Sequence, residues 1–451
     1  TAEKQCDATA QMLGQIAAAS MDADTIKDFY DYEYLSKEEL SELFDNIDTA
    51  AMLEAYGLSD IDQFVLMDRG CNEALNGFLT DENLEAWKTY ALYSLYDYYS
   101  EVCDSQHRNP SVGGEGRVPD DKLARDMLKK LYKEELAYLW SVRYVPEGTK
   151  ESAQKLATDI RDQMREHILA MDWMSEETRK GALQKIDQMG LCVAYPDEWE
   201  NNYQSRSYEM KSKEEGGQLL TEFIQYDQYE AQKQRERLNG LSDQDLWRDT
   251  ASSVADVNCY YNAQHNHIYI LSGMLREPFF SVDNSYEENL GGIGMVIGHE
   301  ITHGFDSQGA RFDADGFYHD WWTAQDKERF DKECDRIADY YEKYRIMDIY
   351  HIDGRYTLTE NIADLGGLSL ISDVCPDNRQ ALQTMYQSYV NVWMTLESET
   401  GLVSALKTDI HSPAEARVNA VLSNTDRFYD AYDITPEDQM YVPKEDRVGI
   451  W

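Results

Sequence analysis

Apolar residues recur at intervals of three and four along the first half of the chain, which is the spacing of an amphipathic helix. Residues 151–168 show it most clearly, with inward positions at Leu156, Ile160, Met164 and Ile168. The same spacing predicts a helix over residues 120–132, and a long, more polar helix over residues 219–238. These positions predict packing, and we assign them no chemistry.

The pattern changes after residue 250. Residues 254–261 and 266–271 alternate well enough to predict two paired strands, with a turn at residues 263–265. His265 and His267 flank that turn and are expected to face solvent. Glycine and proline between residues 109 and 119 predict a loop, and residues 201–217 read as a polar connector. The chain is therefore expected to be mainly α-helical, with a small β-sheet in its C-terminal half.

One segment of this half carries a recognisable chemical pattern, His299-Glu300-Ile301-Thr302-His303. Residues i and i+4 of a helix lie on one face, so both imidazoles can reach a single metal ion. Glu300 follows the first histidine directly and is close enough to take a proton from a metal-bound water. The spacing therefore predicts a zinc site with a general base beside it.

A catalytic zinc ion needs a third protein ligand and an open position. Glu360, 57 residues after His303, is the candidate. Asp364 lies one turn further on the same helical face and could hydrogen-bond the second ring nitrogen of a histidine ligand. Thr357 and Glu360 could instead form a capping box that opens an ordinary helix, and the two interpretations are compatible.

His411 and Arg417 follow a proline-fixed bend, and both could point at developing negative charge. A structural histidine and a surface ion-pair arginine are the plainer interpretation of the two residues. Asp313-Ala314-Asp315-Gly316 resembles the start of a calcium loop, but the remaining ligand spacing is absent. A turn is the better prediction there.

Together these segments resemble the neprilysin and endothelin-converting-enzyme family of zinc metallopeptidases, which includes bacterial oligopeptidases such as oligopeptidase O. The resemblance runs through most of the chain in the family's order. Its further motifs are Leu169-Ala170-Met171-Asp172-Trp173-Met174, the segment from Val193 to Trp199, the segment from Val257 to Tyr261, Asp306, Gly309, Trp321-Trp322, and the terminal Arg447-Val448-Gly449-Ile450-Trp451.

The resemblance implies a role for each matching position. His299, His303 and Glu360 would bind one Zn²⁺ per chain, and Glu300 would act as general base and then as proton donor. Asp364 would orient a ligand histidine. His411 would stabilise the oxyanion, and Arg417 would hold a substrate carbonyl. Further substrate contacts are implied at Asn258, which would anchor the peptide backbone, at the adjacent Cys259, and in a pocket after the scissile bond formed by Met274, Phe279, Met295, Val296, Val392 and Trp393. Plain core packing remains the alternative for the six pocket positions.

The same resemblance implies a two-lobed, thermolysin-like zincin of the gluzincin type that hydrolyses oligopeptides. A helical lobe over residues 1–200 would act as a lid, residues 201–250 would form a connector and crossing helix, and residues 251–451 would form the catalytic domain with the small sheet. Relatives carry about two hundred further residues before the point matched by Thr1. The chain therefore resembles the later part of a longer polypeptide, whose missing N-terminal segment is a possible partner.

Several positions depart from the family pattern. Cys259 replaces the usual alanine after Asn258, and Leu271-Ser272 stands where proline-alanine is usual. Both departures lie near the expected substrate strand, so they could change the pocket without touching the metal. Asp446 precedes Arg447 in place of the cysteine found in animal members, which favours a bacterial type.

The amino-acid composition limits the partners and the cellular location that can be expected. Lys+Arg 42 against Asp+Glu 85 gives a net charge of −43, which disfavours nucleic acid and anionic membranes as partners. No apolar run is long enough to span a membrane. The 7 scattered cysteines do not form a disulfide framework and weakly favour a reducing cytoplasm. Acidic composition and family habit favour an extracellular or cell-envelope location instead.

Two other functions are alternatives to peptide hydrolysis. A catalytically silent relative would bind peptides without cleaving them, and it would be expected to have lost a ligand or the base. A structural zinc protein would fill all four metal positions with protein ligands, commonly cysteines, and no cysteine lies at a plausible fourth position. Peptide substrates therefore remain the expected partners.

Overall fold

The computed structural model describes residues 2–21, 33–102, 120–199, 211–238, 247 and 252–451. Contacts between backbones divide the chain into two compact units. Unit 1 comprises residues 1–133 and 201–244, and unit 2 comprises residues 134–200 and 245–451. The loop expected at 109–119 and most of the connector expected at 201–217 fall outside the described residues.

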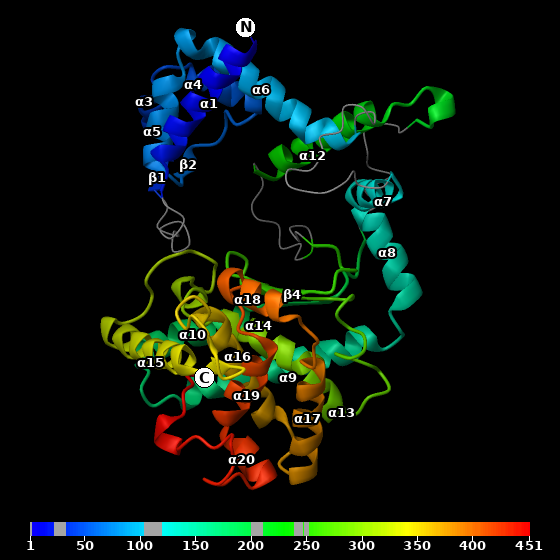
Figure 1. Cartoon of the computed structure of the whole chain (residues 1–451), viewed down its shortest axis with the longest axis vertical. Coiled ribbons are helices and arrows are strands. Elements are labelled where there is room, and N and C mark those ends of the chain that lie inside the picture. Colours follow the sequence, from blue (N-terminus) through cyan, green and yellow to red (C-terminus); the bar gives the residue numbers. More distant parts are fainter. Residues whose placement is uncertain (1, 22–32, 103–119, 200–210, 239–246, 248–251) are drawn as a thin grey trace. The chain divides into compact units, whose positions relative to one another are not determined.

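Unit 1 consists of helices and one short, two-stranded antiparallel sheet (Figure 1). Serine or aspartate caps several of its helices, as Ser36 does for α3 with a complete capping box. Its elements are α1 (Ala2–Ala18), β1 (Glu33–Ser36), α3 (Lys37–Leu43), α4 (Thr49–Tyr56), β2 (Gln63–Leu66), α5 (Arg69–Phe78), α6 (Leu84–Tyr99), α7 (Asp120–Leu131) and α12 (Leu219–Leu238). The helices expected at 120–132 and 219–238 are confirmed as α7 and α12.

Unit 2 contains the candidate site and is also mainly helical. Its helices are α8 (Lys133–Tyr144), α9 (Thr149–Ala170), α10 (Glu176–Gln188), α13 (Tyr286–Asn289), α14 (Met295–His303), α15 (Ala324–Lys343), α16 (Leu358–Val374), α17 (Arg379–Val392), α18 (Glu399–Thr408), α19 (Ala414–Ser423) and α20 (Asp426–Tyr432). A π-helical turn, Leu290–Gly294, leads directly into α14. The expected mainly α fold with a small sheet is confirmed.

The small sheet has three strands in the order β3 (Gly190–Ala194), β5 (His267–Leu271) and β4 (Cys259–Asn262). β3 runs parallel to β5, and β4 runs antiparallel to it. Within the described residues, β4 therefore forms one edge of this sheet, and its outer backbone groups have no partner strand. A short hairpin joins β6 (Arg345–Ile346) to β7 (Tyr350–His351).

Helix α9 belongs to the core of unit 2. Leu156, Ile160, Met164 and Ile168 are at most 2% exposed, as their spacing predicts. They pack in one cluster with residues of α14, α16 and the sheet. Residues 134–200 therefore lie in one compact unit with residues 245–451. The reason is the continuous apolar face of α9, which needs a large core to cover it.

Three glycines let α14 and α16 approach closely. A Cβ atom on Gly298 would lie 3.0 Å from the Gly367 Cα, and one on Gly367 would lie 2.7 Å from the His299 backbone nitrogen. A Cβ on Gly366 would lie 2.6 Å from Thr302 Cγ2. Because larger residues would hold the helices apart, these glycines bring the first turn of α16 against the histidine face of α14.

Some sequence expectations need correction. His265 and His267 are both half-buried, not solvent-facing. The His267 ring lies against Gly190, because β3 pairs with β5 at that position, and burial lowers the pKa of His267. The turn expected at Asp313 is confirmed: Asp313 Oδ1 accepts the N–H groups of Asp315 and Phe317, and Gly316 has φ 81°.

The expectations about disulfides and membrane spans are also tested in the described part of the chain. No disulfide is formed there by the following six cysteines: Cys6, Cys71, Cys192, Cys259, Cys334 and Cys375. Among the described helices, none combines the length and the apolar character that a bilayer crossing requires.

Candidate metal centre and active site

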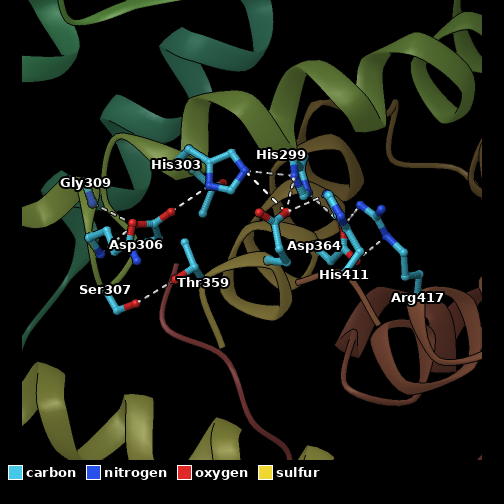
Figure 2. A network of polar contacts seen from close by, with 12 residues as sticks. His299, His303, Asp306, Ser307, Gly309, Thr359, Asp364, His411 and Arg417 are labelled. Atoms are coloured by element: carbon cyan, nitrogen blue, oxygen red, sulfur yellow. Dashed lines mark hydrogen bonds and ion pairs between the residues drawn. The ribbon is translucent and has the colours of Figure 1, made fainter. Parts of the chain in front are cut away.

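Helix α14 presents His299 and His303 on one face, as the i, i+4 spacing predicts (Figure 2). Their Nε2 atoms face each other at 3.0 Å, and the ring planes are nearly perpendicular at 88°. His299 is buried and His303 is half-buried. Two ring nitrogens therefore converge on one point that remains partly accessible.

Glu360 joins this point from the first turn of α16. Its Oε2 lies 3.2 Å from Nε2 of His299 and 3.6 Å from Nε2 of His303. The capping-box alternative does not hold, because the Thr357 hydroxyl accepts no helix N–H. That hydroxyl donates instead to the Asp353 carbonyl and accepts from Asn361 Nδ2. The Glu360 carboxylate is thus left to face the histidines.

A carboxylate stands behind each histidine. Asp364 Oδ1 lies 2.8 Å from Nδ1 of His299, and Asp306 Oδ2 lies 2.6 Å from Nδ1 of His303. Asp306 is itself fixed by the backbone N–H groups of Gln308 and Gly309. A proton on each Nδ1 leaves the Nε2 lone pairs free to bind a cation.

These residues fit a zinc ion. One atom each of His299, His303 and Glu360 can be chosen so that all lie within 4.8 Å of one another. Glu360 Oε2 is buried and accepts no well-aligned hydrogen bond from the described residues, although Nε2 of His299 and of His411 each lie 3.2 Å away. Two imidazoles and one carboxylate make a three-ligand set that is typical of catalytic zinc.

Burial and ion pairing have opposite effects on the pKa values of the carboxylates in this cluster. Burial opposes the charged form of Asp364, but Arg417 and His299 together hold the pKa of its carboxyl below the usual value. Burial likewise opposes ionisation of Glu360, while contacts with His299, His303 and His411 hold its pKa well below the ordinary range. Both carboxylates are therefore ionised at neutral pH, as a cation site requires.

His411 lies at the rim of the cluster, in the segment that precedes α19. Its Nε2 is 3.2 Å from Glu360 Oε2, and its Nδ1 is 2.8 Å from Asp409 Oδ1. The contact with Glu360 raises the pKa of His411 against the effect of burial. The His411 side chain is 41% exposed, so it can contact a bound molecule.

Arg417 lies deeper, on α19. Its Nε and Nη2 donate to Asp364 at 2.8 and 2.7 Å, and its guanidinium sits 4.0 Å from the centre of the Trp393 ring. The surface ion-pair alternative therefore does not hold, because the Arg417 side chain is only 11% exposed. Arg417 is first of all the partner of Asp364.

Glu300 is buried on α14 directly after His299. Against the effect of burial, contacts with Asp306 and Glu360 raise the pKa of the His303 imidazole, and the negative charge of Glu300 adds a smaller contribution to this shift and to that of the Cys259 thiol. Helix α14 packs against edge strand β4. Burial is the main reason that the pKa of Cys259 is well above its usual value, so this thiol stays protonated.

The other expected substrate contacts surround this region. Asn258 is exposed at the start of β4, where its carbonyl accepts the N–H of Leu271. Met295 is buried in the main core, which favours the packing alternative for that residue. The remaining pocket candidates are half-buried and therefore retain some accessible surface: Met274, Phe279, Val296, Val392 and Trp393.

Sequence reasoning missed the roles of two aspartates. The sequence pattern identifies Asp306 only within a motif, and its position three residues after His303 was the available signal, because a carboxylate so near in the chain can reach the histidine ring. Asp409 lies two residues before His411 and holds both its ring and its backbone N–H. A carboxylate next to a candidate histidine is the pattern that could have indicated it.

The helical fold, the HExxH helix and the glutamate from α16 define a zincin-type metallopeptidase architecture. Models of peptidase family M13 match residues 1–196 and 258–448. The chain therefore belongs to peptidase family M13, and the resemblance to the neprilysin family is confirmed.

Known relatives agree with this assignment. The chain is 25% identical to the neutral endopeptidase of Lactobacillus helveticus over 429 residues, covering 93% of this chain and 65% of that protein. It is 31% identical to human neprilysin over 319 residues, covering 66% of this chain and 42% of that protein. The chain thus spans about two thirds, or less, of the length of these relatives.

Solved structures show the same fold. The inhibitor complex of the zinc metalloprotease Zmp1 from Mycobacterium tuberculosis matches with a TM-score of 0.80 and 26% identity, over 99% of this chain and 70% of that one. PepO from Lactobacillus rhamnosis matches with a TM-score of 0.83 at 23% identity, over 100% of this chain and 71% of that one. The second likeness concerns the fold alone.

Proposed function

We propose that this chain hydrolyses peptide bonds in oligopeptides, using one zinc ion held by His299, His303 and Glu360. The observation that carries the proposal is the convergence of two Nε2 atoms and one carboxylate oxygen, with Asp364 and Asp306 behind the two histidines. Membership of peptidase family M13 supports it. When bound, zinc would polarise the scissile carbonyl and lower the pKa of a water molecule from about 15.7 to roughly 7.

Glu300 is the proposed general base. It is buried directly after His299 on α14, the helix that packs against edge strand β4. It would take a proton from the attacking water and pass it to the leaving nitrogen. No covalent intermediate with the protein is required.

His411 and Arg417 are the proposed electrostatic stabilisers of the oxyanion. Asp409 holds Nδ1 of His411, so its Nε2 can be aimed at the oxyanion when it carries a proton. Arg417 uses Nε and Nη2 on Asp364, which leaves Nη1 for a substrate carbonyl. One well-aimed donor contributes on the order of 3 kcal/mol to transition-state stabilisation.

Edge strand β4 is the proposed peptide-binding element. An extended peptide can pair with the open edge of a sheet through backbone hydrogen bonds, and Asn258 is exposed at the beginning of this edge. The half-buried apolar residues near α14 would form the pocket for the side chain after the scissile bond. This arrangement favours extended peptides over folded proteins.

We further propose an extracellular or cell-envelope location, which the acidic composition and the relatives' family habit support. Fractionation of the source cells, followed by immunodetection of the chain, tests it. Recovery in the cytoplasmic fraction would contradict this location without affecting the enzymatic proposal.

Hydrolysis of an internally quenched peptide library tests the enzymatic proposal. Cleavage is expected to stop on chelation and to return with one equivalent of zinc. Glu300→Gln should keep zinc and lose at least ~100-fold in kcat, because it cannot accept the proton. Glu360→Ala should lose the metal, whereas the exposed-site control Glu437→Ala should keep both zinc and activity. A chain that binds zinc stoichiometrically without cleaving any peptide would be the silent relative instead.

A further inference from the structure

Lys185 on α10 is a fully buried lysine that the proposed chemistry does not use. Its exposure is 0%, and among the described residues it is one of the largest side chains that are fully buried. Burying an amine is unfavourable unless its N–H groups find partners. An apolar residue of similar size could fill the same space but could not make these contacts, so the contacts of the lysine indicate its role.

Those contacts are made with the turn that follows α14. Lys185 Nζ donates to the carbonyl oxygens of Gly309 and Phe312, each at 2.7 Å. The rings of Tyr261 and Phe305 lie 5.8 and 5.7 Å from the same nitrogen. The amine is therefore enclosed by two carbonyls and two aromatic rings, all belonging to segments near the candidate metal centre.

The turn from 306 to 312 is the element that positions Asp306 against His303. Asp306 Oδ1 accepts the N–H groups of Gln308 and Gly309, and its Oδ2 lies 2.6 Å from Nδ1 of His303. The turn is also tightly packed, since a Cβ atom on Gly309 would lie 1.8 Å from the His303 carbonyl oxygen. A shift of this turn would therefore move Asp306 relative to His303.

Side chains from other segments satisfy the carbonyls of this turn. Trp322 Nε1 donates to Ala310 at 2.9 Å, and Trp321 Nε1 donates to Phe312 at 3.1 Å. Lys185 differs from these tryptophans because it bridges two carbonyls at once and lies close enough to Asp306 for that carboxylate to affect its pKa. Both the charged and the neutral amine can donate the two hydrogen bonds.

We propose that Lys185 is a positioning residue for the metal centre, acting through the 306–312 turn to hold Asp306 against His303. The proposal rests on the proposed function in that His303 must be a zinc ligand. It predicts that the effect of losing Lys185 depends on the Asp306 carboxylate, because the lysine touches no ligand itself. A lysine that merely packed the core would change stability without this dependence.

A double-mutant cycle on zinc affinity tests the proposal. The dissociation constant for zinc is measured on the purified full chain by competition with a fluorescent chelator, for wild type, Lys185→Met, Asp306→Asn and the double variant. Lys185→Met should weaken zinc binding about 10-fold, near the lower end for residues outside the ligand set. In the Asp306→Asn background the same change should have less than a twofold effect on the dissociation constant, because the carboxylate that the turn positions is gone.

Lys180→Met is the matched control, since Lys180 is exposed on the same helix. Its zinc affinity should equal that of wild type. If Lys185→Met does not fold, Lys185→Gln replaces it, because the shorter amide cannot reach both carbonyls, and a loss of at least threefold in affinity is expected.

The outcomes separate the two proposals. A wild-type chain that binds no zinc would overturn the proposed function itself. Zinc binding by wild type, together with unchanged affinity in a folded Lys185 variant, would overturn only the positioning role. Equal losses from the lysine substitution in both Asp306 backgrounds would have the same meaning.

Discussion

The carboxylate of Asp364 joins His299 to Arg417: Oδ1 lies 2.8 Å from Nδ1 of the histidine, and the guanidinium donates to both carboxylate oxygens at 2.7 and 2.8 Å. All three side chains are largely buried. One residue thus orients a candidate metal ligand and neutralises a buried cation.

Asp364→Ala is expected to affect stability and metal binding together. It leaves the Arg417 charge buried without its partner, which should lower the free energy of unfolding by about 3–5 kcal/mol. Zinc affinity should fall ~10- to 100-fold, because His299 loses the group that orients it. Chemical denaturation of the metal-free protein and chelator competition measure the two effects. Asp377→Ala, which removes a fully exposed partner of Arg427, should change the free energy of unfolding by less than about 1 kcal/mol.

His411→Ala tests the proposed oxyanion role. The variant should retain zinc and show a kcat lowered about 100- to 1000-fold, with a smaller change in KM, as for the loss of one oxyanion donor. Steady-state kinetics on a single quenched peptide provide the measurement. A change confined to KM would reassign His411 to ground-state binding. His351→Ala, at an exposed position, should behave as wild type.

Gly367→Ala tests the close approach of α14 and α16. The added Cβ would lie 2.7 Å from the His299 backbone nitrogen, so the helices must separate. We expect the free energy of unfolding to fall by about 1–3 kcal/mol, as is typical of overpacking. Zinc binding should also weaken, because Glu360 on α16 moves away from the two histidines. Gly14→Ala is the control, since nothing lies within 4 Å of its added Cβ. Wild-type zinc affinity in Gly367→Ala would show that the glycine contact does not set the ligand geometry.

The pH dependence of stability should report on Lys185. Burial lowers the pKa of Lys185 to about 7 in the folded chain, against about 10.4 in an unfolded one. Between these values the unfolded chain binds more protons, so the free energy of unfolding increases as pH rises. Relative to Lys185→Met, wild type should gain up to about 2 kcal/mol between pH 7.5 and 9. Urea denaturation of both metal-free proteins measures this, and parallel pH profiles would contradict it.

Helix α14 shows how much a local sequence pattern can predict. His299, Glu300 and His303 lie in one helical turn, and helix periodicity alone places both histidines on one face. The same reasoning correctly predicted α7, α9 and α12, because an apolar stripe at three- and four-residue spacing has few alternatives to a helix. The expected strands began earlier than β4 and β5 do, since alternation locates a strand better than it locates its ends.

Residues distant in sequence needed the tertiary structure. Glu360 was a candidate from its motif, but only the approach of α16 to α14, made possible by Gly298 and Gly367, brings its Oε2 to 3.2 Å from His299 Nε2. No local pattern in the sequence indicated that Lys185 and Arg417 are buried, because a charged residue on a helix face is normally solvated.

The family, the mainly helical fold and the candidate metal ligands could all be predicted from the sequence. All three depend on the spacing of residues along the chain and on side-chain type, which can be read directly from the sequence. The tertiary structure alone decided which carboxylate stands behind each histidine, that Arg417 pairs with Asp364, and that Lys185 supports the turn bearing Asp306. Such contacts depend on how helices separated by tens of residues pack, and packing is set by the whole core.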